Sequence, residues 1–457
     1  MLQPLRHGHG IHRGSSVPSL TGKALQIQER QVPPFMKLLV VGSGGREHAI
    51  IKKLKENPAA EVIFALPGNG GIAADTVCVP IGACEIERIV SFAVGEHIDF
   101  AVVTPDDPLV LGCADRLREA GIPCFGPGAD AAIIEGSKVF AKNLMKKYHI
   151  PTAAYEVFDD LAKALEYLET SPVPVVIKAD GLALGKGVTV ATTRDEAVRA
   201  VTDAMRDKKF GQSGNRIVIE EFLTGPEVSV LTFTDGKVVV PMVSSMDHKR
   251  ALDNDLGPNT GGMGTIAPNP YYTEEIAERC RKEIFLPTVE AMNREGRTFR
   301  GCLYFGLMLT PDGPKVIEYN CRFGDPETQV VLPLLDCDLL TVMRKTENGT
   351  LSESDVKLRQ GAACCVVMAS DGYPGSYRKG YEIRIPEELR SAVSVAGAIR
   401  DGERLLTNGG RVLGVTATAD TLRGAVAEAY RMVGKISFEN AYYRTDIGKK
   451  ALMRTEK

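Results

Sequence analysis

Short apolar runs alternate with polar, helix-like stretches along the first third of the chain. Three such runs lie at residues 37–41, 62–66 and 100–103. Continuous apolar runs of this length, bounded by turn formers, are typical of strands buried on both faces of a parallel sheet. Helical patterns follow at 46–56 and 114–119. The alternation predicts repeated βα units and a doubly wound α/β sheet, whose ligands bind at the carboxyl ends of its strands.

Glycine-rich loops follow the first two runs, at 42–45 and 67–71. A dinucleotide fingerprint would need a third glycine where Glu47 stands, and an acidic residue at the end of the second run. The sequence has neither and so argues against a nicotinamide cofactor. Exposed amides at a helix N-terminus still bind phosphate well. We therefore predict a site for a phosphorylated small molecule at this edge of the sheet.

A different pattern begins with a helical stretch at 138–148. Residues 173–191 then predict a strand, a glycine-rich loop and a second strand, with Lys178 at the end of the first strand. The spacing is not that of a Walker loop, because it fails at Val188 and no helix follows. Such a hairpin tip can lie over a triphosphate and offer amides and a lysine. Its central residues are Gly181, Gly185, Lys186 and Gly187.

The following strand-like segment predicts contacts to a nucleoside. It carries Glu220 and Glu221 into a turn at 223–225, and Glu227 comes next. Adenine needs a paired donor and acceptor, and ribose needs an acceptor such as a carboxylate. Each of these residues alone is ordinary for a surface strand, and it is their order along the chain that favours a nucleotide site.

Residues 317–329, IEYNCRFGDPETQ, are the most informative stretch of the sequence. They begin as a strand that follows a turn at Asp312-Gly313, and we expect it to pair with the strand-like run 304–310. Because residues two apart share a face of a strand, Glu318, Asn320 and Arg322 project together. A carboxylate, an amide oxygen and a guanidinium on one face suit Mg²⁺ and phosphate. The alternative is an exposed polar face on an edge strand.

Two further segments complete the pattern. Asp247-His248-Lys249-Arg250 precedes a loop at 257–264 that is rich in glycine, which favours close approach of the backbone to a ligand. After residue 361, apolar strands at 361–368 and 410–416 and a helix at 422–433 predict a final α+β domain. Arg411 is the one candidate site residue that we find there, and the alternative is that it belongs to a turn.

Composition narrows the possibilities. A chain of 457 residues predicts about three domains. The 55 basic and 58 acidic residues give no field that would favour nucleic acid or a membrane surface. Ten scattered cysteines without a CxxC pair are typical of buried thiols in a reducing compartment, which predicts a cytoplasmic protein. Residues 1–35 are rich in Gly, Pro, Ser and His and predict a disordered leader, with Met36 as the functional start.

The order of motifs resembles the ATP-grasp ligases and, within them, the family of phosphoribosylamine–glycine ligases. The resemblance runs from Met36 nearly to the C-terminus and rests on GSGGREHA, SK, IKADGLALGKGV, EEFLTGPE, DHKR, GPNTGGMG and IEYNCRFGDPETQ. Thr104-Pro105-Asp106 stands where this family commonly has Gly-Pro-Glu. The resemblance implies an N-terminal sheet at 36–137, an ATP-grasp region at 138–361 with a small lid at about 154–226, and a C-terminal α+β domain at 362–457.

The resemblance also implies roles for individual residues. Lys138 and Lys178 would contact ATP phosphates beneath the Gly181–Gly187 hairpin, Glu220 and Leu223 would read adenine, and Glu227 the ribose. Glu318 and Asn320 would hold Mg²⁺ or Mn²⁺. The remaining assignments concern the other two substrates: Asp247, Lys249, Arg322 and Asp325 would order glycine, the acyl phosphate or the amine, and Gly44, Gly45, Gly68, Asn69, Gly70, Gly71 and Asp106 would bind 5-phosphoribosylamine.

The implied reaction joins glycine to 5-phosphoribosylamine through glycyl phosphate, with ATP consumed, as an early step of purine biosynthesis. The implied partners are these small molecules, with no nucleic acid or membrane, in a monomer or weak homodimer. Two alternatives stay open at this point. One is an ATP-grasp ligase for a different acid and amine, and the other is a nicotinamide oxidoreductase.

Overall fold

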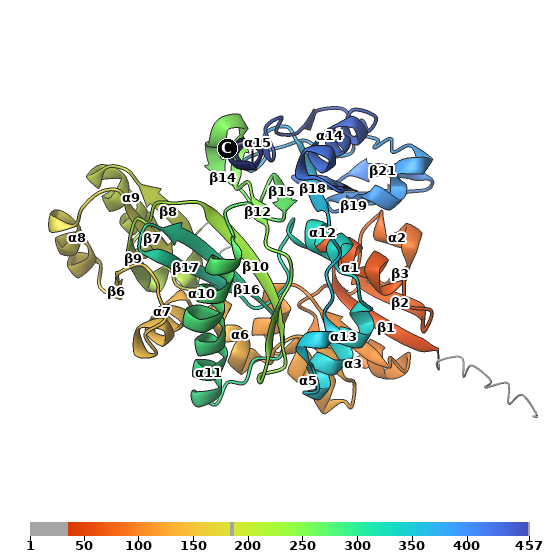
Figure 1. Cartoon of the computed structure of the whole chain (residues 1–457), viewed down its shortest axis with the longest axis horizontal. Helices are drawn as coiled ribbons and strands as arrows, with labels where there is room; N and C mark the ends of the chain where they lie inside the picture. Colours follow the sequence, from red (N-terminus) through yellow and green to blue (C-terminus); the bar gives the residue numbers. More distant parts are fainter. Residues whose placement is uncertain (1–34, 183–186, 456–457) are drawn as a thin grey trace, which may run out of the picture. The chain divides into compact units, whose positions relative to one another are not determined.

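The computed structural model describes residues 35–182 and 187–455, so Gly185, Lys186 and all of the leader except Phe35 lie outside the described residues. The N-terminal part contains a five-stranded sheet in the order β3-β2-β1-β4-β5, in which every neighbouring pair is parallel (Figure 1). Its strands are β1 (Met36–Gly42), β2 (Ala60–Pro67), β3 (Val77–Cys78), β4 (Phe100–Val103) and β5 (Cys124–Phe125). This is the doubly wound sheet that the sequence predicts.

Helices cover both faces of this sheet. They are α1 (Gly45–Leu54), α2 (Ile72–Asp75), α3 (Ile86–Gly95), α4 (Asp106–Val110), α5 (Cys113–Glu119) and α6 (Ala129–Gly136). Leu39 of β1 belongs to the same apolar cluster as Ile89 of α3, whereas its neighbour Leu38 belongs to a second cluster with Ile50 of α1. Successive side chains of a strand point to opposite faces, so β1 lies between two cores.

The central part is built on an antiparallel sheet in the order β11-β10-β16-β17. Its strands are β10 (Glu227–Thr234), β11 (Val239–Pro241), β16 (Gly301–Thr310) and β17 (Gly313–Asn320). The hairpin between β16 and β17 confirms the expected pairing of these two segments. The helical segments of this part are α7 (Lys138–Lys147), α10 (Glu274–Cys280), the π-helical η3 (Arg281–Phe285) and α11 (Leu286–Arg294).

A separate four-stranded sheet, in the order β6-β9-β7-β8, lies within the segment where the sequence predicts a lid. Its elements are β6 (Tyr155–Phe158), α8 (Leu161–Thr170), β7 (Val175–Ala179), β8 (Val188–Ala191), α9 (Arg194–Met205), η1 (Gly211–Asn215) and β9 (Ile217–Glu221). The region has an apolar cluster of its own, which includes Ile177, Val201 and Ile219. A small sheet with its own core can pivot as a unit, as a lid requires.

The C-terminal sheet takes two strands from the central part of the chain, which sequence reasoning did not foresee. It has the order β12-β15-β18-β22-β19, and β23 also pairs with β18. Figure 1 shows β12 and β15 in green beside β18 in blue. The strands are β12 (Met246–Asp247), β15 (Gly264–Ala267), β18 (Ala362–Ser370), β19 (Val393–Val395), β22 (Arg411–Ala419) and β23 (Ala441–Tyr442). The segment 246–267 is therefore held by the C-terminal sheet.

The remaining elements connect or extend these sheets. They are β13 (Arg250–Leu252), η2 (Asp253–Asp255), β14 (Leu256–Asn259), α12 (Thr328–Val331), η4 (Leu332–Leu334), α13 (Leu339–Asn348), η5 (Glu353–Asp355), η6 (Glu387–Ala392), β20 (Ala398–Asp401), β21 (Arg404–Thr407), α14 (Leu422–Val433) and α15 (Lys449–Thr455). Within residues 35–182 and 187–455, none of the helices is both long and apolar enough to span a bilayer.

Candidate active site

One cleft of about 1090 Å³ brings together most of the residues singled out from the sequence. Those that line it are Asp106, Lys138, Lys178, Gly187, Glu220, Leu223, Glu227, Asp247, Lys249, Glu318, Asn320, Arg322 and Asp325. Gly181 is not among the lining residues, and neither are the six residues of the two N-terminal glycine loops. Most of the residues expected to bind nucleotide and metal thus line one cleft.

The strand β17 presents its polar residues to this cleft. Glu318 and Asn320 lie two residues apart, as the period of a strand requires. Opposite Glu318 stands Gly306, where an added Cβ would lie 3.0 Å from the Glu318 Cγ. The ammonium of Lys249 lies 3.3 Å from the Glu318 carboxylate. Mainly because of this charge, and despite burial, the pKa of Glu318 falls to about 2, so its carboxylate is ionised at neutral pH.

These oxygens fit a divalent cation of the hard type. Mg²⁺ usually takes one or two protein ligands and completes its shell with phosphate oxygens and water. Glu318 supplies an anionic oxygen and Asn320 an amide oxygen, and both line the cleft. Nowhere in the described residues do three or more His, Cys, Asp or Glu side chains gather as a metal cluster. The donor set therefore suits a cation that arrives with phosphate ligands.

Two buried lysines share one carboxylate deeper in the cleft. The ammonium groups of Lys142 and Lys178 each lie 3.0 Å from Oε2 of Glu220. Lys178 also donates to the carbonyl of Ile317 at 2.9 Å. Among the described residues, Glu220 Oε1 is buried without a hydrogen-bond partner. Two cations with one anion leave a net positive charge, which suits phosphate groups.

Lys138, in the first turn of α7, contacts Gly181 at the start of the predicted glycine-rich hairpin. Its side chain donates to the carbonyl of Gly181 at 2.9 Å. The preceding Ser137 caps α7, because its hydroxyl accepts from the amide of Phe140 at 3.1 Å. The same hydroxyl donates to Asp180 at 2.8 Å. Lys138 thus contacts the start of the predicted hairpin, whose residues 183–186 lie outside the described residues.

Arg322 continues from β17 into a buried ionic cluster. One of its Nη atoms donates to Glu135 at 2.7 Å, and the same nitrogen lies 3.9 Å from Asp106. Its Nε is buried and finds no partner among the described residues. Burial opposes ionisation of Asp106, but Arg322 and Arg46 outweigh it and lower the pKa of this carboxyl. The cluster thus leaves one donor of Arg322 buried and without a partner among the described residues.

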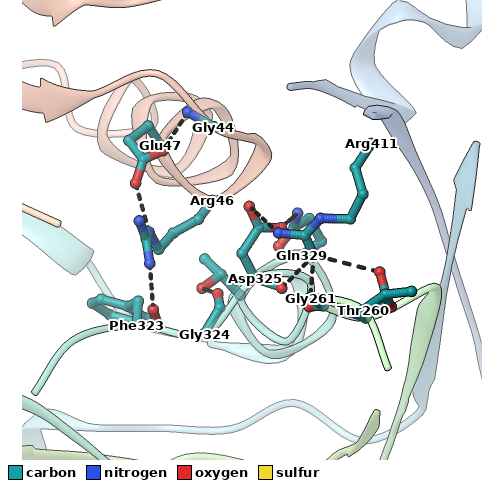
Figure 2. Close-up of polar contacts among 12 residues, drawn as sticks. Gly44, Arg46, Glu47, Thr260, Gly261, Phe323, Gly324, Asp325, Gln329 and Arg411 are labelled. Atoms are coloured by element: carbon teal, nitrogen blue, oxygen red, sulfur yellow. Dashed lines mark hydrogen bonds and ion pairs between the residues drawn. The ribbon is translucent and has the colours of Figure 1, made fainter. Parts of the chain in front are cut away.

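Asp325 lies between arginines from opposite ends of the chain (Figure 2). Arg411, from β22, donates to the carbonyl of Asp325 at 2.6 Å and to the carbonyl of Gly261 at 2.7 Å. Arg46, from α1, donates to the carbonyl of Phe323 at 3.0 Å. Burial alone would raise the pKa of Asp325, but Arg411 and Arg46 lower it. Arg411 is therefore part of the cleft and not simply a turn residue.

Asp247 is half-buried and belongs to a second acidic group. Burial, and then the neighbouring charge of Glu327, raise the pKa of Asp247 well above its usual value. Glu327 is itself buried and accepts from the hydroxyl of Tyr304 at 3.0 Å. An added Cβ at Gly262 would lie 2.6 Å from an Asp247 oxygen. The glycine-rich loop thus approaches this carboxylate as closely as its lack of side chains permits.

The two N-terminal glycine loops contact protein atoms where a phosphate was expected. The Glu47 carboxylate accepts the amide of Gly44 at 2.5 Å, at the N-terminus of α1. The amide of Gly70 donates to the carbonyl of Ala398 at 2.9 Å. A Cβ at Gly71 would lie 2.3 Å from Val395. Close packing therefore accounts for these glycines, and a phosphate contact at Gly44, Gly45, Gly68, Asn69, Gly70 and Gly71 stays a prediction.

The sequence did not predict a site role for three residues that line the cleft, Arg46, Glu135 and Lys142, and named a fourth, Arg411, only as a candidate. Lys142 had a usable signal, because it lies four residues after Lys138 and so on the same face of α7. Glu135 had none, and Arg411 could be named only as a candidate, since the partners of both lie far away along the chain.

Three family models of phosphoribosylglycinamide synthetase match the chain. The N domain matches residues 36–135, the ATP-grasp (A) domain 136–328 and the C domain 363–450. The phosphoribosylamine–glycine ligase of Halalkalibacterium halodurans is 48% identical over 419 residues, which cover 91% of this chain and 97% of the relative. That of Escherichia coli O6:H1 is 45% identical over 428 residues, or 92% of this chain and 100% of the relative.

Solved structures agree with these matches. The crystal structure of phosphoribosylamine–glycine ligase from Thermotoga maritima has a TM-score of 0.80 at 35% identity and covers 90% of this chain and 100% of its own. Biotin carboxylase from Campylobacter jejuni, at 14% identity and a TM-score of 0.71 over 89% of this chain and 93% of its own, shares the fold alone. The chain belongs to the phosphoribosylamine–glycine ligase (phosphoribosylglycinamide synthetase) family of ATP-grasp ligases.

Proposed function

We propose that the cleft joins glycine to 5-phosphoribosylamine with ATP as the energy source, giving glycinamide ribonucleotide, ADP and phosphate, an early step of de novo purine (IMP) biosynthesis. The observation that carries the proposal is the meeting in one cleft of the buried Lys178–Glu220 pair with the Glu318 and Asn320 face of β17. Family membership supports the same reaction.

The chemistry explains why these residue types are needed. A glycine carboxylate oxygen attacks the γ-phosphoryl group, and the bond to ADP breaks to give glycyl phosphate. The amine nitrogen of 5-phosphoribosylamine then attacks the carbonyl carbon, phosphate leaves, and the amine loses a proton. Phosphoryl transfer depends on positioning and charge neutralisation more than on covalent help. Lysines, arginines and oxygen ligands are therefore the required groups.

The nucleotide end of the cleft is assigned to residues from α7 and the lid. Lys138, Lys178 and the Gly181–Gly187 hairpin, including Gly185 and Lys186, would hold the phosphates. Glu220 and Leu223 would face the adenine, and Glu227 the ribose. The unpartnered Glu220 Oε1 and the excess of buried positive charge support this end as the ATP site.

Glu318 and Asn320 would hold Mg²⁺ or Mn²⁺. Such a cation, when bound, neutralises charge on the transferring phosphoryl group. The ionised state of Glu318 supports this role.

The other end of the cleft is assigned to the two remaining substrates. Asp247, Lys249, Arg322 and Asp325 would order glycine, the acyl phosphate and the attacking amine. Asp106 and the N-terminal glycine loops would contact 5-phosphoribosylamine. The positive charge of Arg322, which lines this cleft, supports an anionic ligand there.

The domain boundaries, localisation, oligomeric state and partners that the sequence predicts are also proposals. We infer a division at 36–137, 138–361 with the lid at about 154–226, and 362–457. We further infer a cytoplasmic monomer or weak homodimer that has small-molecule substrates and needs neither nucleic acid nor a membrane for the reaction.

An assay of ADP formation with each substrate omitted in turn tests the proposal. ADP release should require glycine and 5-phosphoribosylamine together, and the product should be glycinamide ribonucleotide. Release with another acid or amine, and not with these two, would point to a different ATP-grasp ligase. A change in nicotinamide absorbance on turnover would point to an oxidoreductase.

A further inference from the structure

Glu135 is a buried carboxylate that the reaction scheme above does not use. It lies near the end of α6 and is 8% exposed. Its Oε2 accepts the backbone amide of Cys321 at 2.7 Å, and its Oε1 accepts an Nη of Arg322 at 2.7 Å. One side chain from the N-terminal part thus holds the segment that leaves β17.

The Glu135 carboxylate also determines the orientation of the Asn320 side-chain amide. The side-chain amide of Asn320 has two branches, and the one that faces Glu135 lies 2.9 Å from Glu135 Oε1. The same branch lies 3.3 Å from the carbonyl oxygen of Tyr319. Both neighbours are acceptors, so the amide nitrogen must face them and donate. Asn320 also lines the cleft. The amide oxygen therefore lies on the other branch of the group, which points away from the Glu135 carboxylate and faces donor groups.

We propose that Glu135 is a positioning residue, which turns the Asn320 oxygen toward the reacting groups and fixes the Arg322 guanidinium beside it. The inference rests on the proposed metal role of Asn320. An asparagine binds a hard cation only through its oxygen, and at 320 the orientation of the amide follows from the partner behind it. Partners behind metal ligands typically change metal affinity about 10–100-fold when removed.

The substitution Glu135→Gln should reverse this orientation. The backbone amide of Cys321 cannot turn away, so the single oxygen of the introduced glutamine would accept from it. The NH₂ group of that glutamine would then face both Asn320 and the Nη of Arg322, which loses its acceptor. The Asn320 nitrogen loses the same acceptor, so Asn320 would turn its oxygen toward this NH₂ group and its nitrogen toward the cleft. Glu135→Gln should therefore weaken Mn²⁺ binding about tenfold or more.

Exchanging the carboxylate and the amide between positions 135 and 320 should restore Mn²⁺ binding. In Asn320→Asp alone, two carboxylates face each other and binding should weaken. In the double variant Glu135→Gln/Asn320→Asp, one oxygen of the introduced aspartate accepts from the introduced glutamine, and the other oxygen faces the cleft. A purely structural role for Glu135 gives no reason for this rescue.

Mn²⁺ binding to the full chain in the presence of ADP, followed by electron paramagnetic resonance, is the measurement. Thermal melting checks that each variant folds, and Asp130→Asn on the exposed side of α6 is the matched control. The expected result is weak binding in both single variants and near-normal binding in the double variant. Unchanged affinity in Glu135→Gln, or no rescue in a folded double variant, overturns the inference.

Glu318→Ala separates this inference from the proposed function. If the wild type binds Mn²⁺ with ADP and Glu318→Ala does not, the metal site stands whatever Glu135 does. If Glu318→Ala binds as well as the wild type, the site itself was placed wrongly, and the inference falls with it.

Discussion

The ammonium nitrogen of Lys249 lies 3.3 Å from a carboxylate oxygen of Glu318. The same ammonium lies 3.5 Å from Glu227. One lysine thus touches both the acid assigned to the metal and the acid assigned to the ribose. The pair holds Glu318 in its charged form, which a divalent cation requires.

Replacing this acid should stop turnover without unfolding the chain. We expect Glu318→Ala to lower the rate of ADP release about 10²–10³-fold, the usual cost of losing a preorganised charge contact. Lys315→Ala, near the other end of the same strand, is the control and should leave the rate unchanged. Near-normal turnover in a folded Glu318→Ala protein would refute the metal role.

The buried Lys142 should give unfolding a specific pH dependence. Burial lowers the pKa of Lys142 to about 8 from 10.5, with Glu220 opposing the shift. Between these two values the unfolded chain binds a proton that the folded chain releases. The free energy of unfolding therefore rises with pH across this window, by at most about 3 kcal/mol.

Lys142→Met should remove that rise. Urea unfolding at several pH values should show the wild type gaining stability relative to the variant from pH 8 to 10.5. The matched control is Lys146→Met, on the exposed face of the same helix, which should track the wild type throughout. Parallel curves for wild type and Lys142→Met would mean that Lys142 titrates normally.

Arg411 should matter for stability as well as for activity. Arg411→Ala removes the donor to the carbonyls of Asp325 and Gly261 and leaves the Asp325 carboxylate, which is only 17% exposed, with less compensating charge. We expect a loss of about 3–5 kcal/mol. The pKa of Asp325, now held low by Arg411, should rise, so the loss should be larger at pH 7 than at pH 4.

Chemical unfolding at the two pH values measures this, with Arg404→Ala on an exposed pair as the control. Arg411→Lys should recover only part of the loss, because an ammonium lacks the planar fork that reaches several carbonyls at once. A loss that is the same at both pH values would show that Asp325 does not depend on Arg411.

The N-terminal glycine loop should respond to substitution as a packing contact. An added Cβ at Gly71 would lie 2.3 Å from Val395, whereas one at Gly95 meets nothing within 4 Å. Gly71→Ala should destabilise the chain by about 1–3 kcal/mol, and Gly95→Ala, at the end of α3, should stabilise it by about 0.5–1 kcal/mol. Melting temperatures of the two variants give the comparison. A Gly71→Ala variant that melts normally yet loses affinity for 5-phosphoribosylamine would favour the phosphate site.

What could be predicted from the sequence depended on residues that are near each other along the chain. The two-residue period of a strand put Glu318 and Asn320 on one face, and the turn signal at Asp312-Gly313 predicted the hairpin that joins their strand to its partner. The strand–loop–strand around Lys178 was read in the same way. These features need only local geometry and burial.

What could not be predicted depends on contacts between distant segments. Glu135 and Arg322 are 187 residues apart, and Arg411 and Asp325 are 86 apart. The glycines at 70 and 71 read as a ligand loop because glycine permits any close approach, and the sequence does not say whether the approaching atoms are phosphate or backbone. Only the structure shows that residues of β19 and β20 pack against Gly70 and Gly71.

The way in which β15 pairs with β18 limits how this chain can be divided. All nine residues of β18, Ala362–Ser370, are buried, and β15 covers one side of it through an antiparallel register from Gly264 to Ala267. A fragment that begins at residue 362 would lose that neighbour and offer a long apolar strand with open amides and carbonyls. Such edges recruit other copies of themselves, so the isolated C-terminal fragment should aggregate unless 246–267 is supplied in trans.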